Sequence, residues 1–207
     1  MKGPRTRARI LDRAIPIAAR DGLEGLTIGT LAVELDLSKS GLFAHFRSKE
    51  DLKLSVLHAA ARRFAGTVAR PVMSASPGVP RLRALFTHWI AWARPPISPS
   101  GCIFLAAALE VDDRPGPVRD FLKKIHTDWF AAIASYVSEA QARGGFRSDL
   151  DPAQFAFDLF GIMTSWHHRS RLLDDPRALT FAEAAFERLL TDAHPRTSNP
   201  ELRMPNG

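Results

Sequence analysis

Cysteine and long apolar runs are both scarce in this sequence. Cys102 is the only cysteine among the 207 residues, so no internal disulfide can form, which agrees with a reducing compartment. The longest apolar runs, such as Cys102 to Leu109, fall well short of the roughly 18–20 residues that cross a bilayer. The start MKGPRTRAR lacks the apolar core of a secretory signal. We therefore expect a globular cytoplasmic protein that does not span a membrane.

Recognisable catalytic motifs are absent as well. The sequence contains no glycine-rich phosphate loop, nucleophile elbow or paired histidine–carboxylate metal motif. Glu110, Asp112 and Asp113 lie together at a predicted helix end, which is not the arrangement of an acid/base pair. His167 and His168 are adjacent, and adjacent helix positions point about 100° apart, so these two do not easily chelate one ion. We predict no enzyme activity, no metal site and no cofactor. An all-helical hydrolase or ligand carrier remains the competing class, and such a protein would have no affinity for DNA.

The alternation of apolar and polar residues that is typical of strands is also missing. Apolar residues instead recur at helical spacing, which predicts an all-α fold of about nine helices. The predicted helices cover residues 6–20, 27–34, 38–46, 48–70, 81–93, 101–111, 117–140, 152–172 and 176–193, with a loop at 71–80. They divide into a small domain at 1–53 and a larger helical domain at 54–194. The polar residues 195–207 are predicted to be a disordered tail.

Proline, glycine and aspartate give four local signals. Gly22 is expected to end the first helix, and Pro16 to kink it, because proline cannot bond to the carbonyl four residues earlier. Asp36 occupies a turn position that favours positive φ. Asp151-Pro152 and Asp175-Pro176 have the pattern of a capping residue followed by the first helical position, so each is expected to open a helix.

The stretch Asp36–Leu52, DLSKSGLFAHFRSKEDL, contains two helix starts close together. Ser38 and Ser48 are natural N-caps, and Ser48 to Asp51 has the spacing of a capping box. The helix between them is too short to be stable unless neighbours pack against it. A helix from Thr27 joined to this one by a tight turn is a helix-turn-helix arrangement, which places its second helix in the major groove of DNA.

The polar residues of this stretch are suited to DNA. Because Leu42 and Phe46 are four positions apart and face inward, Lys39, Ser40 and Gly41 lie on the opposite, leading surface. Lys39 there can reach guanine acceptors. Thr27, His45 and Lys49 are donors placed for phosphates, although a solvated lysine or a packed histidine is the alternative at these positions.

Positive charge gathers at the start of the chain. The net charge is +6 and the pI about 10.1, and four basic residues precede the first acid, Asp12. Such an arm favours nucleic acid, although a solvated terminus or a membrane contact has the same charge pattern. The neighbouring helix-turn-helix favours DNA, and no amphipathic helix with a broad apolar face supports a membrane role. The basic residues are Lys2, Arg5, Arg7 and Arg9.

The segment from Ala8 to Leu52 resembles the DNA-binding domain of the TetR family of transcription regulators. Matches in order and spacing are Thr27, Leu31, Ala32, Ser38, Leu42, His45, Phe46, Ser48, Lys49, Glu50 and Leu52. The segment departs from the family pattern at three positions. Phe43 replaces a usual tyrosine and so lacks a phosphate-contacting hydroxyl, Asp36 stands where glycine is common, and Pro16 is unusual in the first helix.

The resemblance implies a ligand-responsive repressor that binds a near-palindromic operator as a homodimer. It implies that the helices at 152–172 and 176–193 form a four-helix dimer interface, and that the larger domain holds a pocket for a small apolar effector. The aromatic residues of this domain, Trp89 and Trp129 among them, have ordinary core packing as the alternative, and His126 has the alternative of a satisfied polar residue. The expected DNA contacts are Arg5, Arg7, Thr27, Ser38, Lys39, Ser40, Gly41, Phe43, His45 and Lys49; the expected pocket residues are Trp89, Cys102, His126, Trp129, Met163 and His167.

Overall fold

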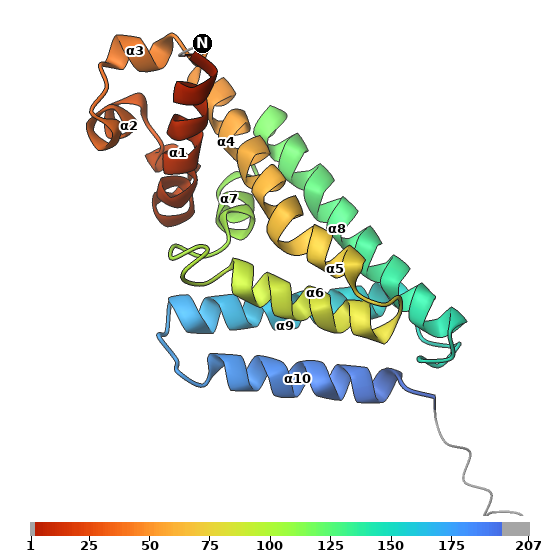
Figure 1. Cartoon of the computed structure of the whole chain (residues 1–207). Coiled ribbons are helices and arrows are strands. Elements are labelled where there is room, and N and C mark those ends of the chain that lie inside the picture. The colour runs from red at the N-terminus through yellow and green to blue at the C-terminus, as the bar shows by residue number, and fades with distance from the viewer. Residues whose placement is uncertain (1–2, 196–207) are drawn as a thin grey trace, which may run out of the picture.

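The computed structural model describes residues 3–195, which contain helices and no strand (Figure 1). The predicted tail lies outside this range except for Pro195, and the side chains of Pro4 and Phe43 are outside the described part as well. The elements are, in chain order, α1 (Gly3–Gly25), α2 (Ile28–Leu35), α3 (Lys39–Phe43), α4 (Lys49–Phe64), the π-helical segment η1 (Ala65–Ala69), α5 (Arg70–Ser74), α6 (Val79–Trp92), α7 (Ile103–Val111), α8 (Pro117–Ala142), α9 (Pro152–Arg171) and α10 (Ala178–Ala193).

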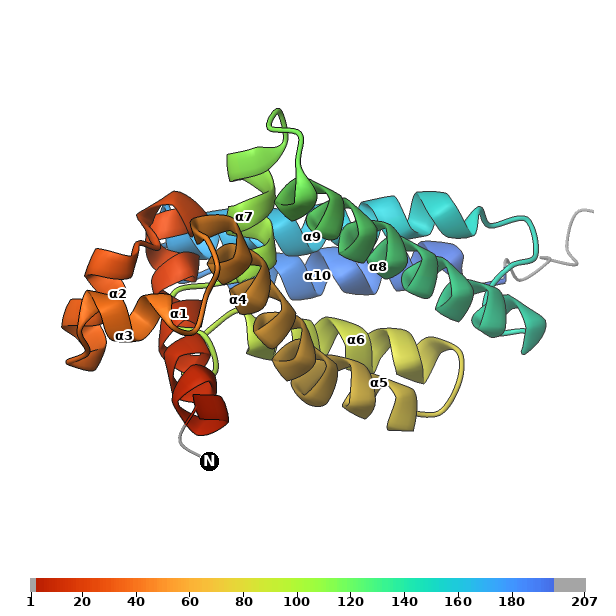
Figure 2. The same cartoon turned by 90° about the horizontal axis from the view of Figure 1, so that it is seen from above.

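The helices form a small head and a larger body. The head consists of α1, α2 and α3, and the body of α5 to α10 (Figure 1). Helix α4 runs from the head into the body (Figures 1 and 2), and α9 and α10 pack together on the side of the body away from α3 (Figure 1). Counted with α4, η1 and α5 as one unbroken helix, the described residues contain nine helices, as predicted. None of these helices combines the length and apolar character needed to cross a bilayer.

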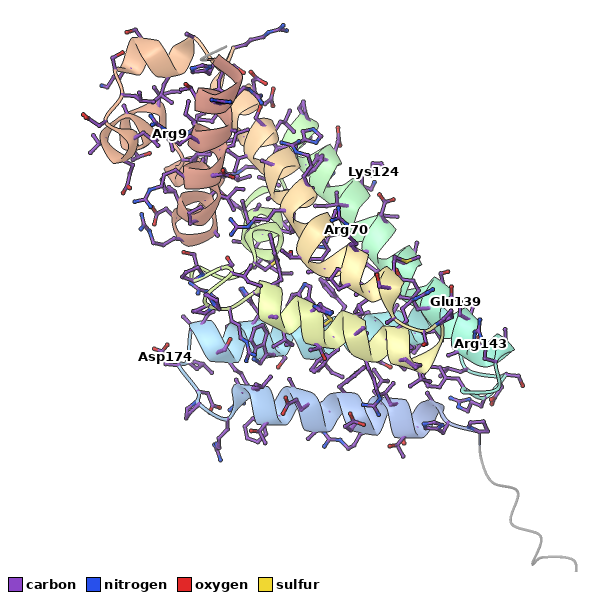
Figure 3. All side chains as sticks on the ribbon, in the orientation of Figure 1. Arg9, Arg70, Lys124, Glu139, Arg143 and Asp174 are labelled. Carbon is purple, nitrogen blue, oxygen red and sulfur yellow. The ribbon has the colours of Figure 1, made fainter. Side chains whose placement is uncertain are left out.

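A continuous apolar core joins the head to the body. In the head, Ile10, Leu26, Leu31 and Leu42 are completely buried, because one apolar stripe of each short helix faces the others. Helix α1 also packs against both α4 and α7, so the head rests directly on the body. Charged side chains, among them Arg9, Arg70 and Lys124, lie on the outside of the ribbon (Figure 3).

The break in α1 lies at Gly22 and not at Pro16. Gly22 has φ 77° and ψ 170°, which is outside the helical region, whereas the helix continues through Pro16. Asp12 is exposed, so water can solvate the carbonyl that Pro16 leaves without a partner. The neighbouring Ile15 and Ile17 are buried in the core and hold the helix on that side. The stop predicted at Gly22 is confirmed.

Several helix boundaries differ from the sequence prediction, and three of the differences affect the site or its connections. Helix α3 ends at Phe43 instead of Phe46. The loop expected from Pro71 begins later, because α5 continues to Ser74. The N–H of Arg70 bonds to the carbonyl of Ala65, five residues earlier, and this π-type register lets the helix pass Pro71, which has no N–H to donate. Helix α10 begins at Ala178, because Asp175 accepts from the Arg177 N–H and forms a turn first.

Candidate DNA-binding face and internal cavity

The turn between α2 and α3 is built by side-chain caps. Thr27 caps α2 by accepting from the Thr30 N–H at 3.0 Å, and Thr30 Oγ1 accepts from the Thr27 N–H at 3.1 Å. Asp36 ends α2 in the left-handed conformation, with φ 52° and ψ 48°, as its position predicted. Its N–H and the N–H of Leu37 both bond back to α2, which fixes the tight turn into α3.

Helix α3 presents a polar face and buries an apolar one. Ser38 caps it by accepting from the Gly41 N–H at 3.0 Å. Leu42 and Phe46 are buried at 0% and 2% exposure, which anchors this five-residue helix to the head. The leading face is exposed and consists of Lys39, Ser40 and Gly41. His45 is half-buried, and nothing is described for the side chain of Phe43.

The start of α4 is capped in a related way. Ser48 accepts from the Asp51 N–H at 3.0 Å. Asp51 Oδ2 accepts from the Arg47 N–H at 2.9 Å, one residue before the position expected of a capping box. Lys49 is therefore the first helical residue, where the free N–H groups and the helix dipole favour an anion.

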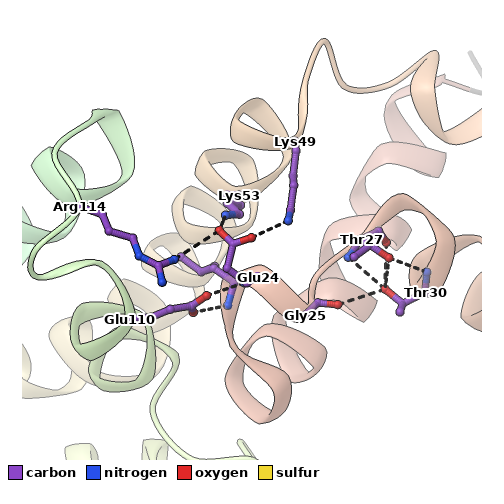
Figure 4. Close-up of polar contacts among 9 residues, drawn as sticks. Glu24, Gly25, Thr27, Thr30, Lys49, Lys53, Glu110 and Arg114 are labelled. Atoms are coloured by element: carbon purple, nitrogen blue, oxygen red, sulfur yellow. Dashed lines mark hydrogen bonds and ion pairs between the residues drawn. The ribbon is translucent and has the colours of Figure 1, made fainter.

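An acidic residue of α1 holds two lysines of α4 (Figure 4). Glu24 Oε2 accepts from Lys49 Nζ at 2.6 Å, and Glu24 Oε1 accepts from Lys53 Nζ. The same carboxylate lies 3.9 Å from the guanidinium of Arg114, in the loop after α7. The hydrogen bonds from Lys49 and Lys53 lower the pKa of Glu24 to about 2, so it is ionised at neutral pH. Lys49 is thus exposed toward solvent but already has a counter-ion.

Glu110 of α7 connects the body to the head (Figure 4). Its two carboxylate oxygens accept from the N–H groups of Leu23 and Glu24, each at 2.6 Å. These N–H groups directly follow the break at Gly22, so they stand where the first N–H groups of a new helical turn would be. A Cβ at Gly22 would lie 2.8 Å from Glu110 Oε2, so glycine allows both the positive φ and the close approach. The sequence alone assigned Glu110 no role beyond a helix end.

The basic residues near the start of the chain lie on a helix, since α1 begins at Gly3. Arg5 and Arg9 are exposed. Arg7 donates to Ser55 Oγ at 2.7 Å, and its guanidinium lies 5.2 Å from the centre of the Phe46 ring. Arg7, predicted to contact DNA, therefore also packs α1 against α4 and is only half exposed.

A cavity of about 400 Å³ lies inside the body. Helices α4 to α9 contribute to its wall, and η1 contributes three residues. Four predicted pocket residues lie on the wall: Trp89, Cys102, His126 and Trp129. The full set of lining residues is Ala61, Phe64, Ala65, Val68, Ala69, Val72, Leu85, Trp89, Cys102, Phe104, Leu105, Ile125, His126, Asp128, Trp129, Ala132, Tyr136 and Phe160.

Met163 and His167, the other two predicted pocket residues, do not line this cavity. Met163 is completely buried in the core. His167 Nε2 accepts from the Cys102 N–H at 3.0 Å, and burial lowers the pKa of His167 to about 4, so the ring is neutral and acts as a backbone acceptor. Within residues 3–195, no cluster of three or more histidine, cysteine or acidic side chains is placed to hold a metal ion.

Helices α9 and α10 expose apolar surface. Phe157 is 66% exposed on α9 and Phe181 is 42% exposed on α10. Both line a groove of about 660 Å³ between the two helices, together with Ile162 and Ala185. Single exposed apolar residues are common, but aromatic rings lining one groove mark a surface suited to another protein.

Two family descriptions match the sequence. Residues 10–56 match "Bacterial regulatory proteins, tetR family" and residues 78–186 match "Tetracyclin repressor-like, C-terminal domain". The chain is 24% identical over 146 residues to the HTH-type transcriptional repressor DhaR of Mycobacterium sp. (strain GP1), covering 70% of this chain and 72% of that protein.

Solved structures share the whole architecture. A TetR transcriptional regulator from Chloroflexus aurantiacus J-10-fl is 27% identical, with a TM-score of 0.81 over 92% of this chain and 94% of that one. The structure of AibR in complex with isovaleryl coenzyme A and operator DNA is 23% identical, with a TM-score of 0.73 over 89% of this chain and 98% of that one. At 23% identity, the similarity to AibR shows a shared fold only.

Proposed function

Because the chain belongs to the TetR family of bacterial regulatory proteins, we propose that it is a repressor that binds a near-palindromic operator as a homodimer and is released by a small apolar effector. One observation carries this proposal above the others. A single unbroken helix, Lys49–Ser74, begins in the head, separated from the end of α3 by five residues, and continues into the wall of the cavity at Phe64, Val68 and Val72. A change in the cavity can therefore reach the head along a rigid element.

In the proposed complex, α3 lies in the major groove. Lys39 and Ser40 face the base edges, and the absence of a side chain at Gly41 lets the backbone come close. Thr27 and Lys49, at the starts of α2 and α4, face phosphates, as does the exposed Arg5. One α3 reads only a few base pairs, so specificity requires a second copy.

The proposed dimer interface is the face of α9 and α10. Two copies that meet about a two-fold axis would each supply the same patch, which here is the groove lined by Phe157, Ile162, Phe181 and Ala185. Four helices would pack there, two from each copy. The distance between the two α3 helices is then set by the bodies, as operator binding requires.

We propose that an effector acts by favouring a body conformation that separates the two heads wrongly for the operator. Two contacts transmit this change. Phe64 of α4 lines the cavity, and Glu110 holds the start of the turn at Leu23 and Glu24. Because Cys102 and Phe104 at the start of α7 also line the cavity, a ligand that shifts α7 shifts Glu110 as well.

The proposal is tested by selecting duplexes from a random library with the full chain and measuring their binding by fluorescence anisotropy. The selected sequences should be inverted repeats with half-sites about 34–36 Å apart, or a multiple of that spacing. A protein that is monomeric, or that prefers no inverted repeat at moderate ionic strength, would contradict the proposal.

Glu24→Gln should strengthen binding to operator and to random DNA alike. The carboxylate competes with phosphate for Lys49 and repels the DNA backbone. Exposed pairs of this kind are worth about 0.2–1 kcal/mol each, so with two heads a gain of about twofold to thirtyfold per dimer is expected. Anisotropy titrations at several salt concentrations measure it. Glu34→Gln is the matched control, because this substitution removes the same charge, and Glu34 pairs with Arg13 and not with Lys49. An equal gain in the control would show that only net charge matters.

A further inference from the structure

Among the described residues, the cavity wall has no lysine or arginine side chain to receive an acidic ligand. Asp128 is the one charged residue on it, and that carboxylate is 61% exposed and pairs with Lys124 at 2.7 Å. A carboxylate or phosphate placed inside would therefore be a buried charge without a cationic partner, which is strongly unfavourable. A cation finds no unpaired carboxylate on the described wall, because Asp128 already pairs with Lys124 and is exposed.

Aromatic rings form much of the remaining wall. The Phe64 ring makes edge contacts with Phe104 and Trp129, at centroid distances of 5.8 and 5.3 Å. Phe160 lies on the same wall and contacts Phe130 behind it at 4.8 Å. Rings prefer such edge and offset contacts with other rings, so an aromatic ligand gains more here than an aliphatic one of equal size. Small side chains on α4, η1 and α8 leave room for a ring: Ala61, Ala65, Ala69 and Ala132.

His126 supplies a hydrogen-bond acceptor. Its Nε2 faces the carbonyl oxygen of Phe104 at 3.4 Å, and a carbonyl oxygen only accepts, so Nε2 carries the hydrogen. Burial lowers the pKa of His126, which keeps the ring neutral. Nδ1 then has a free lone pair. Two other polar groups on the wall are less suitable as acceptors. The Tyr136 hydroxyl already donates to Met73 Sδ at 3.4 Å, and the Cys102 thiol is a weak hydrogen-bonding group.

We propose that the effector of this protein is an uncharged aromatic molecule with one hydroxyl or N–H group that donates to Nδ1 of His126. This inference rests on the proposed function, since it names the ligand class of the same cavity. The proposal predicts that neutral phenols and related compounds bind and that aromatic acids do not. The acids have similar rings, but their negative charge finds no lysine or arginine on the wall.

Four probes with one ring system test the class: 2-naphthol, naphthalene, 2-naphthoate and (2-naphthyl)methylammonium. Binding to the full chain without DNA is measured by calorimetry and by fluorescence of Trp89 and Trp129 on the wall. We expect 2-naphthol to bind about fivefold more tightly than naphthalene, because of one hydrogen bond, and at least about a hundredfold more tightly than either ion. Failure of both uncharged probes to bind, or binding of an ion as tight as that of 2-naphthol, would overturn the proposal.

Variants locate the site and the hydrogen bond. His126→Phe should abolish the difference between 2-naphthol and naphthalene, whereas a merely structural role would weaken both equally. Ala132→Phe should block both probes by filling the cavity, and its control is Ala131→Phe at the exposed neighbouring position. These measurements contain no DNA, so a failure of the probes to bind would contradict the proposed ligand class and not the proposed operator binding. Loss of operator binding with 2-naphthol still bound would instead contradict the repressor function.

Discussion

Phe157→Asp is expected to convert the dimer into monomers and to weaken operator binding at least about a hundredfold. Phe157 is 66% exposed on α9 and lies in the groove that we propose as the dimer interface. In a two-fold interface, one substitution replaces two aromatic rings with two carboxylates, and each carboxylate loses hydration when the copies meet. A monomer brings one α3 to the operator, so the second head no longer binds at high effective concentration.

Light scattering with size-exclusion chromatography measures the mass, and anisotropy measures binding to the selected operator. Leu109→Asp is the matched control, because Leu109 is 79% exposed on α7, outside the α9–α10 groove. It should remain dimeric and bind as the wild type does. If Phe157→Asp were still a dimer with unchanged operator affinity, the interface would have to lie elsewhere on the body.

The capped helix starts could be predicted from the sequence because their chemistry is local. Thr27, Ser38 and Ser48 each accept an N–H three residues later, and Asp36 adopts positive φ, as their neighbours along the chain require. The same local pattern identified the family. The periodic apolar positions predicted nine helices for the same reason, since a helix buries one stripe of its own sequence.

Contacts between distant elements could not be predicted in this way. Glu110 lies 87 residues after Leu23, and only the packing of α7 on α1 brings its carboxylate to the break at Gly22. Met163 and His167 have the residue types of a pocket wall, but the rotation of α9 turns Met163 into the core and directs His167 to the Cys102 N–H. Helical spacing predicts which face of a helix is buried, but it does not predict which residues of that face line a cavity.

The π segment shows a third kind of limit. Pro71 is a strong signal for the end of a helix, and the sequence prediction ended the helix one residue before it. The bond from the Arg70 N–H to the Ala65 carbonyl shifts the register so that Pro71 is accommodated. That shift is energetically poorer than an α-helical turn, and here it adds Ala65, Val68 and Ala69 to the cavity wall. Helix propensity alone therefore did not predict this π-helical segment, which forms part of the proposed ligand site.

Lys39→Ala and Lys49→Ala should weaken DNA binding in two different ways. Lys39 is exposed on α3 where it can bond to base edges, and a bidentate contact contributes about 1–3 kcal/mol of discrimination. With two heads per dimer, the loss of preference for operator over random DNA is expected to be about 2–6 kcal/mol, with random binding nearly unchanged. Anisotropy against both duplexes measures the difference.

Lys49→Ala should instead weaken all sequences alike and flatten the salt dependence by about one unit per head, because a phosphate contact releases counterions without reading bases. Its effect should be the smaller one, since Lys49 must leave Glu24 before it can bind phosphate, and Glu24 keeps Lys53 afterwards. Lys123→Ala on the exposed side of α8 removes the same charge from the body and should change neither quantity. Equal losses on operator and random DNA from Lys39→Ala and Lys49→Ala would mean that α3 is not the element that reads the bases.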